Sequence, residues 1–290
     1  MTWFALSLCA ALTQAVQFAV VKGRGRDIPP LVIVAWTQAV AFVAWVLFFL
    51  VSGHPFAAPR PAWPAIAASA ALVTGMSGLL ARASARGDIS IVGPVFALSP
   101  VFTVLPDAVL SGTLPSALGW LGLGLSLVGT LSLSAGQVTL VGRLRTLLAR
   151  RDALDALGAA VLLGFLAAVD RWGALALGPP SFLVCSHGAT ALLTTAIAIF
   201  LTPRGLVAST APRHVMTVLS HGLLGVAGTG MQTTALTMAP AAYVNAIRRM
   251  SSVVAVLLGR ALFREPDLGR RLASALLACL GAACLLLASR

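Results

Sequence analysis

Charged residues are scarce in this sequence. They make up 10% of its 290 residues, whereas an ordinary soluble domain carries about 25%. Apolar residues make up 59% of the chain, which leaves few polar side chains to cover a surface in water. The composition argues against a soluble domain and favours an all-α integral membrane protein, because lipid admits helices that satisfy their own backbone hydrogen bonds.

Residues suited to catalysis are also few. The chain has 8 acidic residues and 4 histidines, which are scattered along the sequence. A membrane enzyme needs clustered acids, bases, nucleophiles or metal ligands, and no HExxH, GxSxG or P-loop motif is present. We therefore expect no catalytic residues, no bound metal and no cofactor, and a membrane enzyme is the least favoured function.

Cysteine offers no framework for a disulfide-rich or zinc-binding protein. The 4 cysteines lie inside apolar runs, and none forms a CxxC pair. We interpret them as small packing residues. The first 21 residues lack a basic leading region and run into further apolar segments, so we expect a first membrane helix rather than a cleaved signal.

The excess of positive charge has a membrane explanation. The net charge is +12, but the basic residues sit in short loops between apolar runs, with no basic domain that could bind nucleic acid. Short loops rich in lysine and arginine usually face the cytoplasm and its anionic leaflet. We expect the protein to contact membrane lipid and a small-molecule substrate, and not to bind nucleic acid. Whether it forms a homodimer is left open by the sequence.

Apolar runs long enough to cross a bilayer fill the chain. Reading from one polar break to the next predicts ten transmembrane helices, near 3–21, 31–51, 64–82, 89–110, 116–135, 153–172, 180–201, 215–236, 241–263 and 271–288. The fourth holds three prolines, so we expect it to be kinked or broken. The longest polar connection, 136–155, falls at the midpoint.

The two halves of the sequence resemble each other. Residues 119–134 align with 270–287, and an offset of 152 also places 89–102 on 241–254. Each half holds five expected helices, and an odd number makes the second half enter the membrane from the opposite side. We therefore expect two inverted five-helix repeats, 1–140 and 141–290, which is a common architecture of secondary transporters.

These features resemble the drug/metabolite transporter superfamily, in its EamA-like branch. Half-repeats of that family end in an apolar helix, a turn with glutamate and a last helix with a late glycine. Glu265 in "LFREP" and Gly281 in "LGAACLLL" are similar, whereas the first half has "SGTLP" without glutamate. The resemblance implies a permease that moves a small polar metabolite across the membrane by alternating access.

Two adjacent arginines, Arg248 and Arg249, interrupt the ninth expected helix. Placing an arginine side chain near the bilayer centre costs a free energy of about 3 kcal/mol or more. Either the arginines have a function within the membrane, or their side chains extend to the lipid headgroups, and the sequence leaves both alternatives open. Plastid phosphate translocators are similar in carrying paired basic residues there, which implies a contact with substrate. Guanidinium groups suit carboxylate or phosphate, so we expect an anionic or zwitterionic substrate.

Other polar residues inside apolar runs complete the candidate site. The expected substrate-binding residues besides the arginines are Gln14, Gln17, Asp170, His187, Gln232, Tyr243 and Asn245. Asp107 is the candidate for a coupling proton. Such residues also join membrane helices by hydrogen bonds without binding substrate.

Two other transport functions stay open. A lipid-headgroup flippase would use the same arginines for a phosphate. Small multidrug exporters of the superfamily use a glutamate in the first helix, where this chain has Gln14 and Gln17, so proton-coupled export of lipophilic cations is disfavoured. Richness in alanine, glycine, leucine and arginine favours a bacterial source, and we expect a multi-pass protein of the inner membrane.

The basic residues also predict an orientation. Fifteen of the 20 fall in the connections after the first, third, fifth, seventh and ninth expected helices. The positive-inside rule therefore places those connections in the cytoplasm and both chain ends outside, whereas the family resemblance implies both ends inside. A reporter active only in the cytoplasm, fused after Arg290, should stay silent, and a strong signal would reverse the assignment.

Overall fold

A computed structural model gives the fold. It describes residues 1–24, 28–57, 59–86, 95–96, 98–112, 114–133, 150–249 and 268–288. Helices are the only regular secondary structure in these segments. The prediction of an all-α protein is therefore confirmed for the described part of the chain.

The helices follow the expected apolar runs closely. The first half contains α1 (Thr2–Arg24), α2 (Pro30–Ser52), the 3₁₀ turn η1 (Arg60–Ala62), α3 (Trp63–Arg86), α5 (Ser99–Ser111) and α6 (Ala117–Leu133). The second half contains α8 (Arg151–Leu177), α9 (Pro179–Leu201), α10 (Pro203–Ser209), α11 (Pro212–Leu236), α12 (Ala241–Arg249) and α14 (Leu268–Ala288). The short helix α10 was not expected.

Proline and glycine set several helix boundaries. Prolines lie in the first turns of α2 and α9, where a missing backbone donor is tolerated. Gly53 ends α2 with φ 62° and donates its N–H to the carbonyl of Phe49, and Gly112 ends α5 with φ 70° in the same way. Only glycine adopts this left-handed conformation without strain.

The outer helices present apolar side chains outward. Leu50, Leu192 and Phe200 are 74%, 76% and 85% exposed, which suits contact with lipid rather than water. Four of the described helices are long and apolar enough to cross a membrane, namely α2, α3 (over Trp63–Ala83), α8 and α9. The expected ten crossings stay a prediction.

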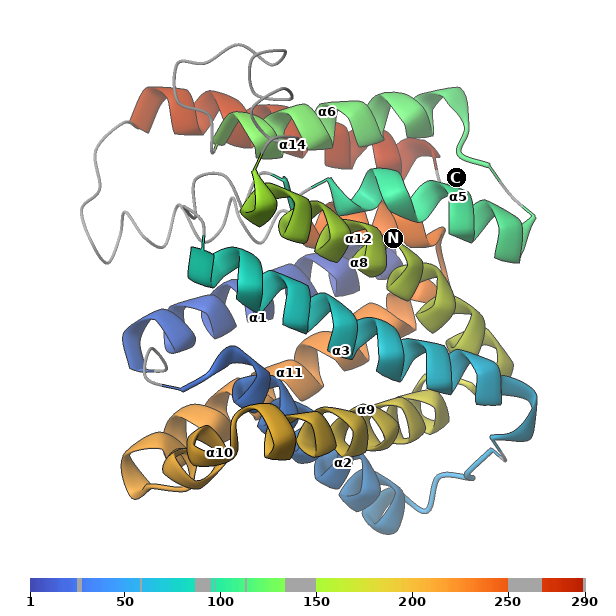
Figure 1. The fold of residues 1–290 in the computed structure, drawn as a ribbon. Helices are drawn as coiled ribbons and strands as arrows, with labels where there is room; N and C mark the ends of the chain where they lie inside the picture. Colours follow the sequence, from blue (N-terminus) through green and yellow to red (C-terminus); the bar gives the residue numbers. More distant parts are fainter. Residues whose placement is uncertain are drawn as a thin grey trace.

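Helices from the two halves pack against each other in pairs. The main pairs are α6 with α14, α3 with α8, α1 with α11, and α2 with α9. Figure 1 shows α6 beside α14 along one edge of the molecule, with α2, α9 and α10 along the opposite edge. The halves therefore form one interlocked bundle.

The short helix α12 lies inside this bundle. Eight of its 9 residues are buried, and it packs against α1, α5, α6 and α8. Its apolar residues belong to the largest hydrophobic cluster, together with Trp3, Val104 and Leu285. Any charge carried by α12 is therefore held within the protein.

Some expectations fall on residues that the structure does not describe. These are most of the fourth expected helix before Ser99, the connection 136–149, the ninth helix beyond Arg249, and Glu265. Within the described part, α5 begins at Ser99 and contains Pro106.

The pair α6 and α14 is held at close range by two glycines. A Cβ on Gly281 would lie 2.4 Å from the backbone nitrogen of Ser126, and one on Gly122 would lie 2.9 Å from the carbonyl oxygen of Gly281. These contacts are with backbone atoms, which cannot rotate away. Small residues of this kind allow membrane helices to approach closely.

We expect Gly281→Ala to lower the free energy of unfolding by about 1–3 kcal/mol, because the helices must separate. Gly124→Ala is the matched control, since nothing lies within 4 Å of its added Cβ. Alanine favours helix over glycine, so this control should not destabilise. Thermal unfolding of both purified variants in detergent tests this, and equal unfolding temperatures would contradict the close contact.

Candidate functional site

The two arginines at the end of α12 face an internal cavity rather than the outer surface. The cavity measures about 170 Å³. Arg249 is 8% exposed. Helices α1, α2, α3, α8, α9, α11 and α12 all contribute to the wall, so the cavity lies between the two halves of the chain.

The wall combines polar and apolar side chains. Its polar residues are Gln14, Gln38, Ser69, Asp170, Ser186, His187, Thr190, Thr229, Gln232, Thr233, Arg248 and Arg249. Its apolar residues are Val73, Met76, Phe96, Leu163, Leu166, Phe182 and Leu183. A largely buried cavity with a few convergent polar groups is typical of small-molecule sites.

Each arginine has a neighbour that orients its guanidinium. The Nε of Arg248 donates a hydrogen bond to Oε1 of Gln14 on α1 at 3.2 Å. The Cζ of Arg249 lies 5.2 Å from the ring centroid of Phe96, which is within the range of a cation–π interaction. Both side chains are thus positioned before any substrate enters.

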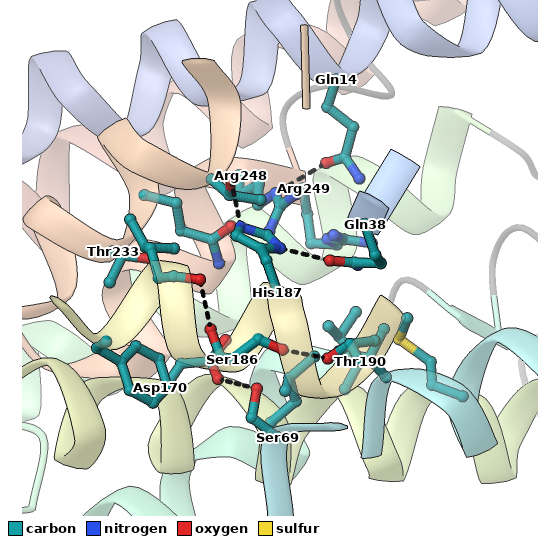
Figure 2. A pocket seen from close by; sticks show the side chains of 18 of the residues that line it. Gln14, Gln38, Ser69, Asp170, Ser186, His187, Thr190, Thr233, Arg248 and Arg249 are labelled. Atoms are coloured by element: carbon teal, nitrogen blue, oxygen red, sulfur yellow. Dashed lines mark hydrogen bonds between the residues drawn. The ribbon is translucent and has the colours of Figure 1, made fainter. Parts of the chain in front are cut away.

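A carboxylate occupies a different part of the same wall. Asp170 on α8 accepts a hydrogen bond at 2.7 Å from the hydroxyl of Ser69 on α3. Figure 2 shows Asp170 and Ser69 on one side of the pocket and Arg248 and Arg249 on the other. The cavity therefore carries charges of both signs, with positive charge in excess.

His187 on α9 joins three helices at the cavity. Its Nδ1 pairs with Oε1 of Gln38 on α2, and its Nε2 lies 3.3 Å from the hydroxyl of Thr229 on α11. That hydroxyl donates to the carbonyl of Gly225 at 2.7 Å. His187 is fixed in place by these contacts.

Three predicted site residues do not line the cavity. Gln17 donates to the backbone carbonyl of His221 at 2.9 Å, which ties α1 to α11. Asn245 donates to the hydroxyl of Thr103 at 2.8 Å. Tyr243 is 2% exposed, and its hydroxyl lies against Gly119 of α6. All three make contacts between helices.

Asp107 also lies away from the cavity, at a junction of four helices. Its Oδ1 accepts from Nη1 of Arg171 at 2.9 Å, and its Oδ2 accepts from the backbone N–H of Ala241 at 2.7 Å. The Nε of Arg171 also donates to the carbonyl of Leu236 at 3.1 Å. One ion pair thus joins α5 and α8 to the end of α11 and the start of α12.

Of the predicted residues, the structure brings together Gln14, Asp170, His187, Gln232, Arg248 and Arg249. Sequence reasoning did not select Ser69, Ser186 or Thr190. The last two share one face of α9 with Leu183 and His187, at helical spacing, which is a signal that the sequence contains. Ser69 meets Asp170 across 101 positions, and nothing in the sequence indicates that contact.

Comparison with known families supplies the class of protein. Residues 1–135 match the EamA-like transporter family. The match covers the first half of the chain. The resemblance predicted from the sequence is therefore confirmed over these residues, and the family that they resemble consists of membrane transporters. Arg248 and Arg249 lie outside the matched residues, so their interpretation rests on the geometry of the cavity.

The fold recurs in solved structures. One of them, described only as the crystal structure of a protein, matches with a TM-score of 0.79 at 19% sequence identity, covering 100% of the present chain and 99% of its own. At this identity the likeness shows the fold alone. A search of curated proteins found no match.

The ion pair between Arg171 and Asp107 should be important for stability. The two side chains are 16% and 5% exposed, and removing one partner of a buried pair typically costs about 3–5 kcal/mol. We expect Arg171→Gln to lower the unfolding temperature clearly. Arg82→Gln is the matched control, because Arg82 is 58% exposed in its pair with Asp155 and such pairs contribute about 0–1 kcal/mol. Thermal unfolding in detergent compares the two, and an equal response would contradict the structural role.

Proposed function

We propose that this protein is a secondary-active transporter that moves a small anionic or zwitterionic metabolite across the membrane by alternating access. The observation that carries this proposal is the internal cavity with Arg248 and Arg249 in its wall. A buried guanidinium is expensive unless it meets negative charge. Among the described residues of its wall there is one acidic side chain for two arginines, so an anion would balance the charge.

The shape of the guanidinium group restricts the class of anion that the site would bind. Its planar fork of donors matches carboxylate, phosphonate, sulfonate or phosphate groups. Arg248 uses its Nε for Gln14, so that hydrogen bond does not occupy its two terminal nitrogens. A small anion that receives donors from both arginines fits the volume and the charge of the site.

Helix packing supports two inverted five-helix repeats, 1–140 and 141–290. Exchanging the halves would pair α1 with α8, α2 with α9, α3 with α11, α5 with α12, and α6 with α14. This exchange converts the contact between α3 and α8 into a contact between α11 and α1. It likewise converts the contact between α11 and α2 into a contact between α3 and α9. All four contacts are present, as a pseudo-two-fold axis requires.

The same arrangement gives a route for alternating access. The cavity lies between the halves, so rocking one half against the other would expose it to each side in turn. The proposal places the protein as a multi-pass component of a bacterial inner membrane. Thermal-shift screening of small anions and zwitterions against the purified chain, followed by uptake of the stabilising compounds into proteoliposomes, tests the function directly.

Each arginine should be required for transport. We expect Arg248→Ala and Arg249→Ala each to reduce uptake of a stabilising anion at least tenfold, because one donor fork is lost. Lysine should restore little at either position if the contact is bidentate. Arg82→Ala serves as the control, since its side chain is 58% exposed and is absent from the cavity wall. Full uptake by both alanine variants would refute the proposed site.

A further inference from the structure

Two opposite charges face the cavity without forming an ion pair. Asp170 and Arg248 both line its wall. The ion pairs found in the described residues are Arg82–Asp155, Arg150–Asp152 and Arg171–Asp107. The carboxylate of Asp170 instead accepts from Ser69, and the guanidinium of Arg248 donates to Gln14. Space between the two charges is therefore available to a third group.

We infer that Asp170 is the proton-binding group of the transporter, and that its protonation is linked to binding of an anion at Arg248 and Arg249. This inference rests on the proposed function. An anion that enters the cavity brings negative charge towards the Asp170 carboxylate, and repulsion between charges is strong where water is excluded. A proton from water that binds the carboxylate forms a neutral acid and removes the repulsion. One proton thus accompanies each anion, and both leave together.

Asp107 is less suited to this role, although the sequence drew attention to it. Both of its oxygens accept hydrogen bonds, from Arg171 and from the N–H of Ala241. A proton on Asp107 would disrupt the contact that joins α5 and α8 to α12. Asp170 has one described donor, the Ser69 hydroxyl, which donates to the carboxylate and can instead accept from the protonated acid.

The surroundings of Asp170 define the control. The positive charges on the cavity wall come from α12. Arg171, which follows Asp170 on α8, is instead paired with Asp107 of α5. Helices α1, α2, α3 and α11 contribute amide and hydroxyl side chains to the wall. From α9 comes His187, and an imidazole is the side chain whose ordinary titration range includes neutral pH. A pH effect on binding must therefore be assigned between Asp170 and His187.

The linkage has a definite sign. Protonated Asp170 leaves two positive charges for the anion, so affinity is highest at low pH. Affinity falls as pH rises through the titration of Asp170, by at most about tenfold per pH unit when a single proton is involved. Linkage is reciprocal, so the anion must also draw a proton onto the protein. A proton gradient would then drive accumulation of a monovalent anion with no net movement of charge.

Two matched probes test the inference on the purified full-length chain. Ethanesulfonate carries a negative charge that does not titrate near neutral pH, and taurine adds an ammonium group to the same skeleton. Affinity for each is measured by calorimetry at about pH 5 and about pH 8, together with proton uptake in weakly buffered solution. The variants are Asp170→Asn, His187→Gln and Ser69→Ala.

We expect wild-type affinity for ethanesulfonate to fall at least tenfold from the lower to the higher pH, with proton uptake on binding. Asp170→Asn should bind equally well at both values without proton uptake. His187→Gln should keep the fall in affinity between the two pH values and the proton uptake, even where its absolute affinity differs from that of the wild type. Ser69→Ala removes a donor that stabilises the charged carboxylate, so the fall should move to higher pH. This variant keeps the test decisive if Asp170→Asn does not purify.

Other results overturn the inference in distinguishable ways. Binding that is independent of pH in the wild type, or a pH effect that persists in Asp170→Asn, refutes the proton role and leaves anion transport standing. A preference for taurine at the higher pH that disappears in Asp170→Asn would make Asp170 a contact for an ammonium group instead. Failure of the wild type to bind either probe at the lower pH would count against the proposed anion site itself.

Discussion

The burial of two guanidinium groups in an apolar bundle is the constraint on which the rest of the structure depends. Each loses most of its hydration when α12 is enclosed by α1, α5, α6 and α8, and such a loss is tolerated only where polar partners replace water. Gln14 and Phe96 supply part of that replacement. A ligand bound in the cavity can supply the other polar partners that the guanidinium groups need.

A second charged junction holds the helix that carries the arginines. Asp107 binds the first backbone N–H of α12 and also pairs with Arg171. A carboxylate at a helix N-terminus satisfies a donor that has no partner within the helix and interacts favourably with the helix dipole. Asp170 and Arg171 thus have different roles, because adjacent positions on α8 point in different directions. Asp170 faces the cavity, and Arg171 faces the junction.

The sequence predicted the broad features because they depend on composition and local order. Apolar runs and prolines located most helices, and a charged pair inside such a run singled out Arg248 and Arg249. Rotation of side chains about a helix was harder to predict. Gln14 and Gln17 are three residues apart, yet Gln14 reaches the cavity whereas Gln17 bonds the carbonyl of His221. Tyr243 and Asn245 share α12 with the arginines but pack on α6 and α5. These differences depend on which neighbouring helix each face meets, and that is a long-range property of the fold.

The partners of Asp107 have a consequence for how the protein is made. The N–H that it binds belongs to Ala241, 134 residues later in the chain. At about 5–20 residues per second, a ribosome needs roughly 7–27 s to synthesise that interval. During this time the partner of Asp107 on α12 does not yet exist, although Arg171, 64 residues after Asp107, is made earlier. The first half must therefore wait near the insertion machinery, or in contact with water, until the second half arrives to complete the bundle.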